Sequence, residues 1–85
     1  MNTEEETKRG FEFLDKGNYL EALDLLLPSA QNGNPKSQAA VGYIYMFGFD
    51  YDRNINEAIK WLTKAANADI GEAAHNLGTL YLACE

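Results

Sequence analysis

Few side chains in this sequence have the types and spacing that chemistry at a site would need. Asp50, Asp52 and Asn54 alternate as in the first half of a calcium-binding loop. The sixth position of such a loop needs glycine and the twelfth needs glutamate, but this chain has Ile55 and Trp61 there. We therefore expect no metal site, and nothing else in the sequence indicates a cofactor.

Groups that could act in catalysis are equally scarce. Cys84 is the single cysteine and His75 the single histidine, which leaves no material for a disulfide framework or a zinc cluster. A nucleophilic thiol needs an activating partner, and the spacing around Cys84 suggests none. The sequence also contains no Ser-x-x-Lys pair and no glycine-rich phosphate loop. We predict that the protein is not an enzyme and has no catalytic residues.

The composition is that of an ordinary globular chain with an excess of acid. It has 85 residues, 46% of them hydrophobic, and a formal charge of −6 at pH 7. That charge argues against binding to nucleic acid or to an anionic membrane surface. The uncharged run over 39–49 is too short to span a bilayer, and the acidic start, Glu4-Glu5-Glu6, is unlike a signal peptide. We expect one cytoplasmic domain.

An internal repeat organises the chain. Moving the sequence by 36 positions places Glu21-Ala22-Leu23 on Glu57-Ala58-Ile59 and Val41-Gly42 on Leu77-Gly78. Within each period the apolar residues recur with helical spacing, and nothing alternates with the period of a strand. A repeat of this length in which each unit holds a pair of helices is typical of a solenoid.

Helix boundaries are well marked. Asn34 before Pro35 and Asn54 three residues before Glu57 are typical helix starts. Gly17 and Gly33 lie where helices are expected to stop. The pattern predicts an all-α fold with five helices near 4–16, 19–32, 35–47, 55–68 and 70–84.

The residues that carry these patterns resemble two related repeat families. The tetratricopeptide repeat (TPR) is matched by Arg9-Gly10, Phe13, Gly17-Asn18-Tyr19, Ala22 and Leu26. The Sel-one-like repeat (SLR), which has a longer turn, is matched by Val41-Gly42, Tyr45, Gly48, Asp50, Asn54, Ala58, Trp61 and Lys64-Ala65-Ala66. The resemblance implies an α-solenoid of antiparallel helix pairs, a right-handed superhelix of the TPR/SLR type. We expect a single helical-repeat domain over 1–85, with a TPR-like pair at about 3–33, an SLR-like pair at about 34–68 and a partial third repeat at about 69–85.

The same resemblance implies a protein–protein interaction scaffold or adaptor that binds a partner protein or peptide on its concave face. In the TPR register the first helix of each pair lines the groove. The candidate partner-binding residues are then Phe11, Leu14, Lys36, Tyr43, Met46, Phe47, His75, Thr79 and Leu82. Tyr43 and Phe47 are the candidate anchors, with packing into the core as the alternative. His75 is either a pH-sensitive contact or a plain solvated residue.

Two further hypotheses follow from charge and from the end of the sequence. A small acidic protein of this kind could be an immunity or antitoxin-type protein that neutralises one basic protein partner, because complementary charge speeds association. The last predicted helix has no capping glycine and no following outer helix. We therefore expect either a longer repeat array or self-association through this uncapped C-terminal helix, whose Leu77, Leu80, Tyr81 and Leu82 leave an apolar face open.

Overall fold

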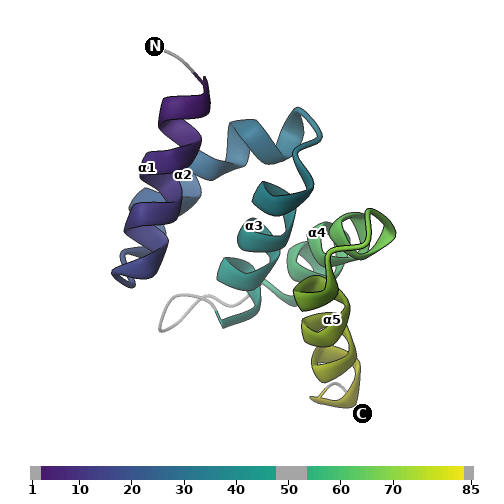
Figure 1. Cartoon of the computed structure of the whole chain (residues 1–85). Coiled ribbons are helices and arrows are strands. Elements are labelled where there is room, and N and C mark those ends of the chain that lie inside the picture. The colour runs from purple at the N-terminus through teal and green to yellow at the C-terminus, as the bar shows by residue number, and fades with distance from the viewer. Residues whose placement is uncertain (1–2, 48–53, 84–85) are drawn as a thin grey trace.

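The computed structural model describes residues 3–47 and 54–83, and these residues form five helices and no strand (Figure 1). The helices are α1 (Thr3–Asp15), α2 (Tyr19–Gln31), α3 (Pro35–Phe47), α4 (Ile55–Asn67) and α5 (Gly71–Ala83). The predicted all-α class is confirmed, and each predicted boundary agrees to within one residue. The calcium-like segment with Asp50 and Asp52, the turn residue Gly48, and Cys84 lie outside the described residues.

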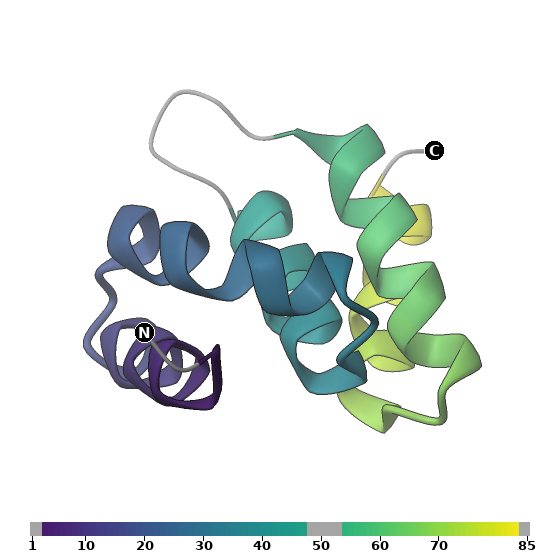
Figure 2. The ribbon, with the colours of Figure 1, turned by 90° about the horizontal axis from the view of Figure 1, so that it is seen from above.

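The helices follow one another in a stack of antiparallel pairs. Each packs on the next along the chain, and α5 also contacts α3. Figure 2 shows α1 with α2 at one end, α3 in the middle and α4 with α5 at the other end. The Cα positions extend over 42 × 29 × 18 Å, so the stack is elongated.

Helix α3 belongs to two hydrophobic clusters, because its stretch over 39–47 carries no charged residue on any face. Val41 and Ile44 pack with α2 residues and Trp61 in the first cluster. Met46 packs with residues of α4 and α5 in the second cluster. Because α3 is shared, the two clusters form one continuous core along the stack.

Three helices end in the same way. The second residue after the helix adopts the left-handed conformation at Gly17 (φ 79°), Gly33 (φ 100°) and Asp69 (φ 64°). The next amide then donates to a carbonyl five residues back: Asn18 to Phe13 at 2.9 Å, Asn34 to Ser29 at 3.1 Å and Ile70 to Ala65 at 3.1 Å. These bonds satisfy carbonyls that the helix ends would otherwise leave unpaired.

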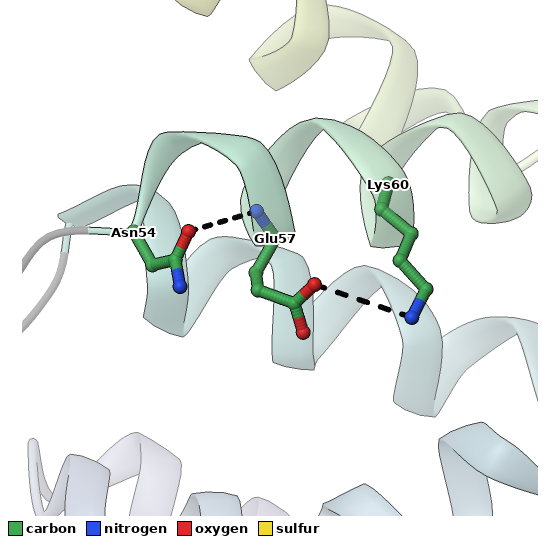
Figure 3. A network of polar contacts seen from close by, with 3 residues as sticks. All are labelled: Asn54, Glu57 and Lys60. Carbon is green, nitrogen blue, oxygen red and sulfur yellow. Dashed lines mark hydrogen bonds and ion pairs between the residues drawn. The ribbon is translucent and has the colours of Figure 1, made fainter.

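The predicted helix starts are also confirmed. The Asn34 side chain accepts a hydrogen bond from the Ser37 amide at 3.1 Å. The Asn54 side chain accepts one from the Glu57 amide at 3.0 Å, and Lys60 approaches the Glu57 carboxylate at 4.0 Å (Figure 3). Such caps satisfy amides of the first turn and fix where each helix begins.

Two buried polar contacts join α2 to α3. The Ser29 and Ser37 hydroxyls lie 2.8 Å apart. The Gln38 side-chain amide donates to the Ala30 carbonyl at 3.2 Å. Buried polar groups need partners, so these bonds constrain how one helix pair sits on the next.

Glycines allow the helices within each pair to approach closely. Gly10 and Gly42 are both the eighth residue of their helix. A Cβ on Gly10 would lie 2.6 Å from Cγ of Leu26, and a Cβ on Gly42 would lie 2.7 Å from Cγ of Leu62. Separations this short are overlaps, so only glycine fits at either position.

Substitution by alanine should have opposite effects at two glycines. Gly42→Ala should destabilise the fold by about 1–3 kcal/mol, because its methyl group overpacks against Leu62. Gly78, an exposed glycine inside α5, has nothing within 4 Å of its Cβ position. Gly78→Ala should therefore stabilise by about 0.5–1 kcal/mol through helix propensity alone. Urea unfolding of both variants tests this, and equal effects would contradict the packing account.

Candidate functional site

A single groove crosses the three helices that come first in their pairs. It has a volume of about 790 Å³ and runs from α1 over α3 to the start of α5. Side chains from both ends of the stack therefore face one hollow. It is lined by Phe11, Leu14, Asp15, Gly17, Tyr19, Lys36, Ala39, Ala40, Tyr43, Asp69, Ile70, Gly71, Glu72 and Asn76.

The rings of Tyr19 and Tyr43 line this groove, and the ring of Phe47 lies against Tyr43 outside the lining. Tyr43, on α3, meets the ring of Tyr19 edge-on, with the ring centroids 6.4 Å apart. Phe47, one turn further along α3, lies 4.6 Å from Tyr43 between centroids. Rigid, half-exposed rings of this kind supply large contact area at little entropic cost, which is why they serve as anchors in interfaces.

The charged side chains of the groove are mostly acidic. Asp15 comes from the end of α1, Asp69 from the turn before α5, and Glu72 from the first turn of α5. Lys36 is the one basic residue in the lining. The lining thus carries three carboxylates against one ammonium group, in a chain that is itself acidic. Such a surface attracts basic groups.

Asp69 combines this charge with an unfavourable backbone conformation. Among the described residues it is the only non-glycine with a positive φ. The two equivalent turns have glycine at this position, which adopts the left-handed conformation without steric cost. Asp69 therefore adds a carboxylate to the groove lining, although the left-handed conformation of this turn is less favourable for aspartate than for glycine. Local strain of this kind is concentrated at functional positions.

Eight of the nine predicted binding residues fall into three groups. Phe11, Leu14, Lys36 and Tyr43 line the groove. His75 lies beside it and lines a shallower hollow with Tyr43, Glu72 and Asn76. Phe47, Thr79 and Leu82 are solvent-exposed but are absent from both linings, with Phe47 at 52% and Leu82 at 74% exposure. The Thr79 hydroxyl donates to the His75 carbonyl of its own helix.

Met46 is a correction to the prediction. It is only 5% exposed and packs in the second core cluster with α4 and α5 residues. Residue 46 lies two turns after Ala39 on the same side of α3, at the margin of the groove, and there α4 and α5 cover its side chain. The alternative that Phe47 is a core residue is also wrong, since half of its side chain is exposed.

Sequence reasoning missed the part of the groove that the turns provide. Tyr19, Asp69 and Ile70 flank helix ends and are not on the inner face of any first helix. The sequence could have singled out Asp69, because it replaces the glycine that the other two turns have at this position. Nothing in the sequence beyond the Gly-Asn-Tyr motif singled out Tyr19 as a groove residue.

Two other kinds of site have no support in the described chain. Across 3–47 and 54–83, no group of three acidic, histidine or cysteine side chains could hold a metal ion. In the same residues, none of the helices has the length and apolar character of a membrane span.

Trp61 is buried in the core, and the ammonium groups of Lys60 and Lys64 each lie 5.1 Å from the centre of its ring.

The stacked helix pairs and their shared groove define a helical-repeat protein of the solenoid class. The Sel1 repeat model matches residues 8–34, 35–70 and 71–83, and the chain therefore belongs to the Sel1 repeat family. The first of these matches covers the segment whose Gly-Asn-Tyr turn resembles a TPR. Sel1 repeats are non-catalytic helical repeats that generally mediate protein–protein interaction.

The chain is also similar to one characterised regulator. It is 40% identical over 57 residues to the chitin synthase regulator SKT5 of Saccharomyces cerevisiae, strain ATCC 204508 / S288c. The match covers 67% of this chain but only 8% of SKT5. No solved structure matches the chain.

Burial of the groove tyrosine predicts a loss of stability at high pH. Burial, together with the hydrogen bond and charge of Tyr19, raises the pKa of Tyr43. Burial and the charge of Glu57 also raise the pKa of Tyr45. Since the unfolded chain then loses these protons first, the free energy of unfolding should fall as the pH rises above about 10.

Urea unfolding at several pH values from neutral to strongly alkaline measures this effect. Tyr43→Phe removes one of the two tyrosines whose pKa is raised, so the stability of this variant should fall less steeply over the same range. Equal slopes for the two proteins would show that Tyr43 ionises alike in the folded and unfolded chains.

Proposed function

We propose that this protein is an interaction scaffold or adaptor module and that its groove binds a segment of a partner protein. The observation that carries the proposal is the pair of half-exposed rings of Tyr19 and Tyr43, set in one groove that residues of α1, α2, α3 and α5 line. Membership of the Sel1 repeat family supports it, because these repeats generally act by binding other proteins.

The lining also indicates the chemistry of the partner. An apolar side chain of the partner packs against Tyr43 and Leu14, and a lysine or arginine lies beside Asp69 and Glu72. Charge-assisted hydrogen bonds to carboxylates are stronger than neutral ones and set the direction of a bound segment. The partner segment that fits is thus apolar and basic.

Selection from a random peptide library tests the first part of this proposal. Peptides selected on the wild-type protein should share an apolar residue close to a basic one. Tyr43→Ala should weaken a selected peptide by about tenfold or more, as expected for a central anchor. Leu20→Ala is the matched control, because Leu20 is a large apolar residue of α2 with 63% exposure and lies outside the groove lining.

Circular dichroism first establishes that both variants remain helical. A peptide that binds wild type and Tyr43→Ala equally well would place the binding surface elsewhere. Equal losses in the Tyr43 and Leu20 variants would also contradict the groove assignment.

The acidic side of the groove has its own test. Asp69→Asn removes the charge and retains a residue type that tolerates the left-handed turn. Affinity for a selected basic peptide should fall severalfold, and the remaining affinity should depend less on salt. Asp24→Asn, an exposed acid of α2 outside the groove, should change neither quantity. If both variants behave alike, net charge rather than the Asp69 carboxylate guides the peptide.

A further inference from the structure

A shallower hollow opens from the groove where α5 contacts α3. It has a volume of about 450 Å³ and is lined by Tyr43, Gly71, Glu72, His75 and Asn76. All of these residues except His75 also line the groove. The hollow is therefore a side branch of the groove, and a side chain of a segment bound in the groove can enter it.

The acidic residue of the hollow has no partner of opposite charge. Glu72 lines the hollow, and Asp69 belongs to the adjoining part of the groove. Within the described parts of the chain, neither carboxylate takes part in an ion pair. Lys36, the one basic residue of the groove lining, is not part of the hollow. The group that the hollow attracts is therefore a cation.

An aromatic ring forms another side of the hollow. The Tyr43 ring is held in place by Tyr19, 6.4 Å away, and by Phe47, 4.6 Å away, both measured between ring centroids. The Tyr43 hydroxyl is hydrogen-bonded to Tyr19, so Tyr43 offers a ligand its ring rather than its hydroxyl. A cation within about 6 Å of the centre of such a ring is attracted to it.

The remaining lining distinguishes between the two basic side chains. Glu72 and Asn76 are four residues apart on α5 and thus share one face, where both present oxygen acceptors. Gly71 adds no side chain, and nothing lies within 4 Å of its Cβ position, so space is left for a large group. A guanidinium group is planar, stacks on rings and has five N–H donors in a fixed plane, whereas an ammonium group is a compact, strongly hydrated charge.

We propose that this hollow is a subsite for an arginine of the partner segment and that it selects arginine over lysine. The proposal rests on the proposed function, because the hollow is reached through the groove. The guanidinium group stacks on the Tyr43 ring and donates hydrogen bonds to the Glu72 carboxylate and the Asn76 side-chain oxygen. The apolar contact in the groove thus holds the segment, and the arginine determines which segment is accepted.

Three versions of one peptide selected on the wild-type protein test the subsite by isothermal titration calorimetry. The basic position of the peptide carries arginine, lysine or citrulline, which has nearly the shape of arginine but no charge. The arginine version should bind about fivefold to tenfold more tightly than the lysine version, because lysine forms fewer hydrogen bonds and does not stack. The citrulline version should bind more weakly than the arginine version, since the attraction to Glu72 is lost.

Matched variants of the protein show which side chains produce the selectivity. Asn76→Ala and Tyr43→Leu should each weaken the arginine version more than the lysine version, so the ratio of the two affinities narrows. Glu72→Gln should weaken both charged versions and leave the citrulline version unchanged. Glu21→Gln removes an exposed acid of α2 outside both linings and should alter none of the affinities. Circular dichroism establishes that each variant remains helical.

Three results would overturn the proposal. They are selected peptides that contain no basic residue, equal affinities of wild type for the arginine and lysine versions, and a ratio that neither Asn76→Ala nor Tyr43→Leu changes. Each of them leaves the groove itself intact as long as Tyr43→Ala weakens the peptide. Peptides that bind independently of Tyr43 would instead contradict the proposed function and the subsite together.

Discussion

The contact between a glycine of one helix and a leucine of the next sets the spacing on which this fold depends. Leu26 and Leu62 are fully buried because Gly10 and Gly42 have no side chain to exclude them. A closer approach of the helices gives each leucine more contacts, and the dispersion energy of many such contacts compensates for a glycine inside a helix. Each pair is thereby fixed as a unit, and the Ser29, Ser37 and Gln38 hydrogen bonds between α2 and α3 set one pair on the next.

Much of this architecture could be predicted from the sequence because local signals determine it. Asparagine caps at 34 and 54, glycines after two helices and an apolar stripe at helical spacing each act within a few residues. The central place of α3 was also predictable, since a helix with no charged face has to be covered on several sides. These signals agree with one another, and the helix boundaries follow from them.

The groove was predictable only in part, because its lining depends on how helices rotate and where turns fold back. Met46 and Tyr43 lie three positions apart on α3, yet one is in the core and the other in the groove. A difference of this kind arises from the contacts of α4 and α5, which no local pattern encodes. Tyr19 reaches the groove from the first residue of α2, a second helix of its pair, and Asp69 reaches it from a turn with a left-handed backbone, so the periodicity of the first helices indicates neither.

The position of α5 at one end of the described stack ties the groove to the stability of a single helix. One side of α5 contributes Glu72 and Asn76 to the groove, and another side exposes Gly78. In a stacked array each element is held mainly by its neighbours, so a helix with an open face separates from the stack at lower free energy than one covered on both sides. When α5 separates, the groove loses the part of its lining that this helix provides. A segment that binds only the closed groove would therefore also stabilise α5 against this local opening.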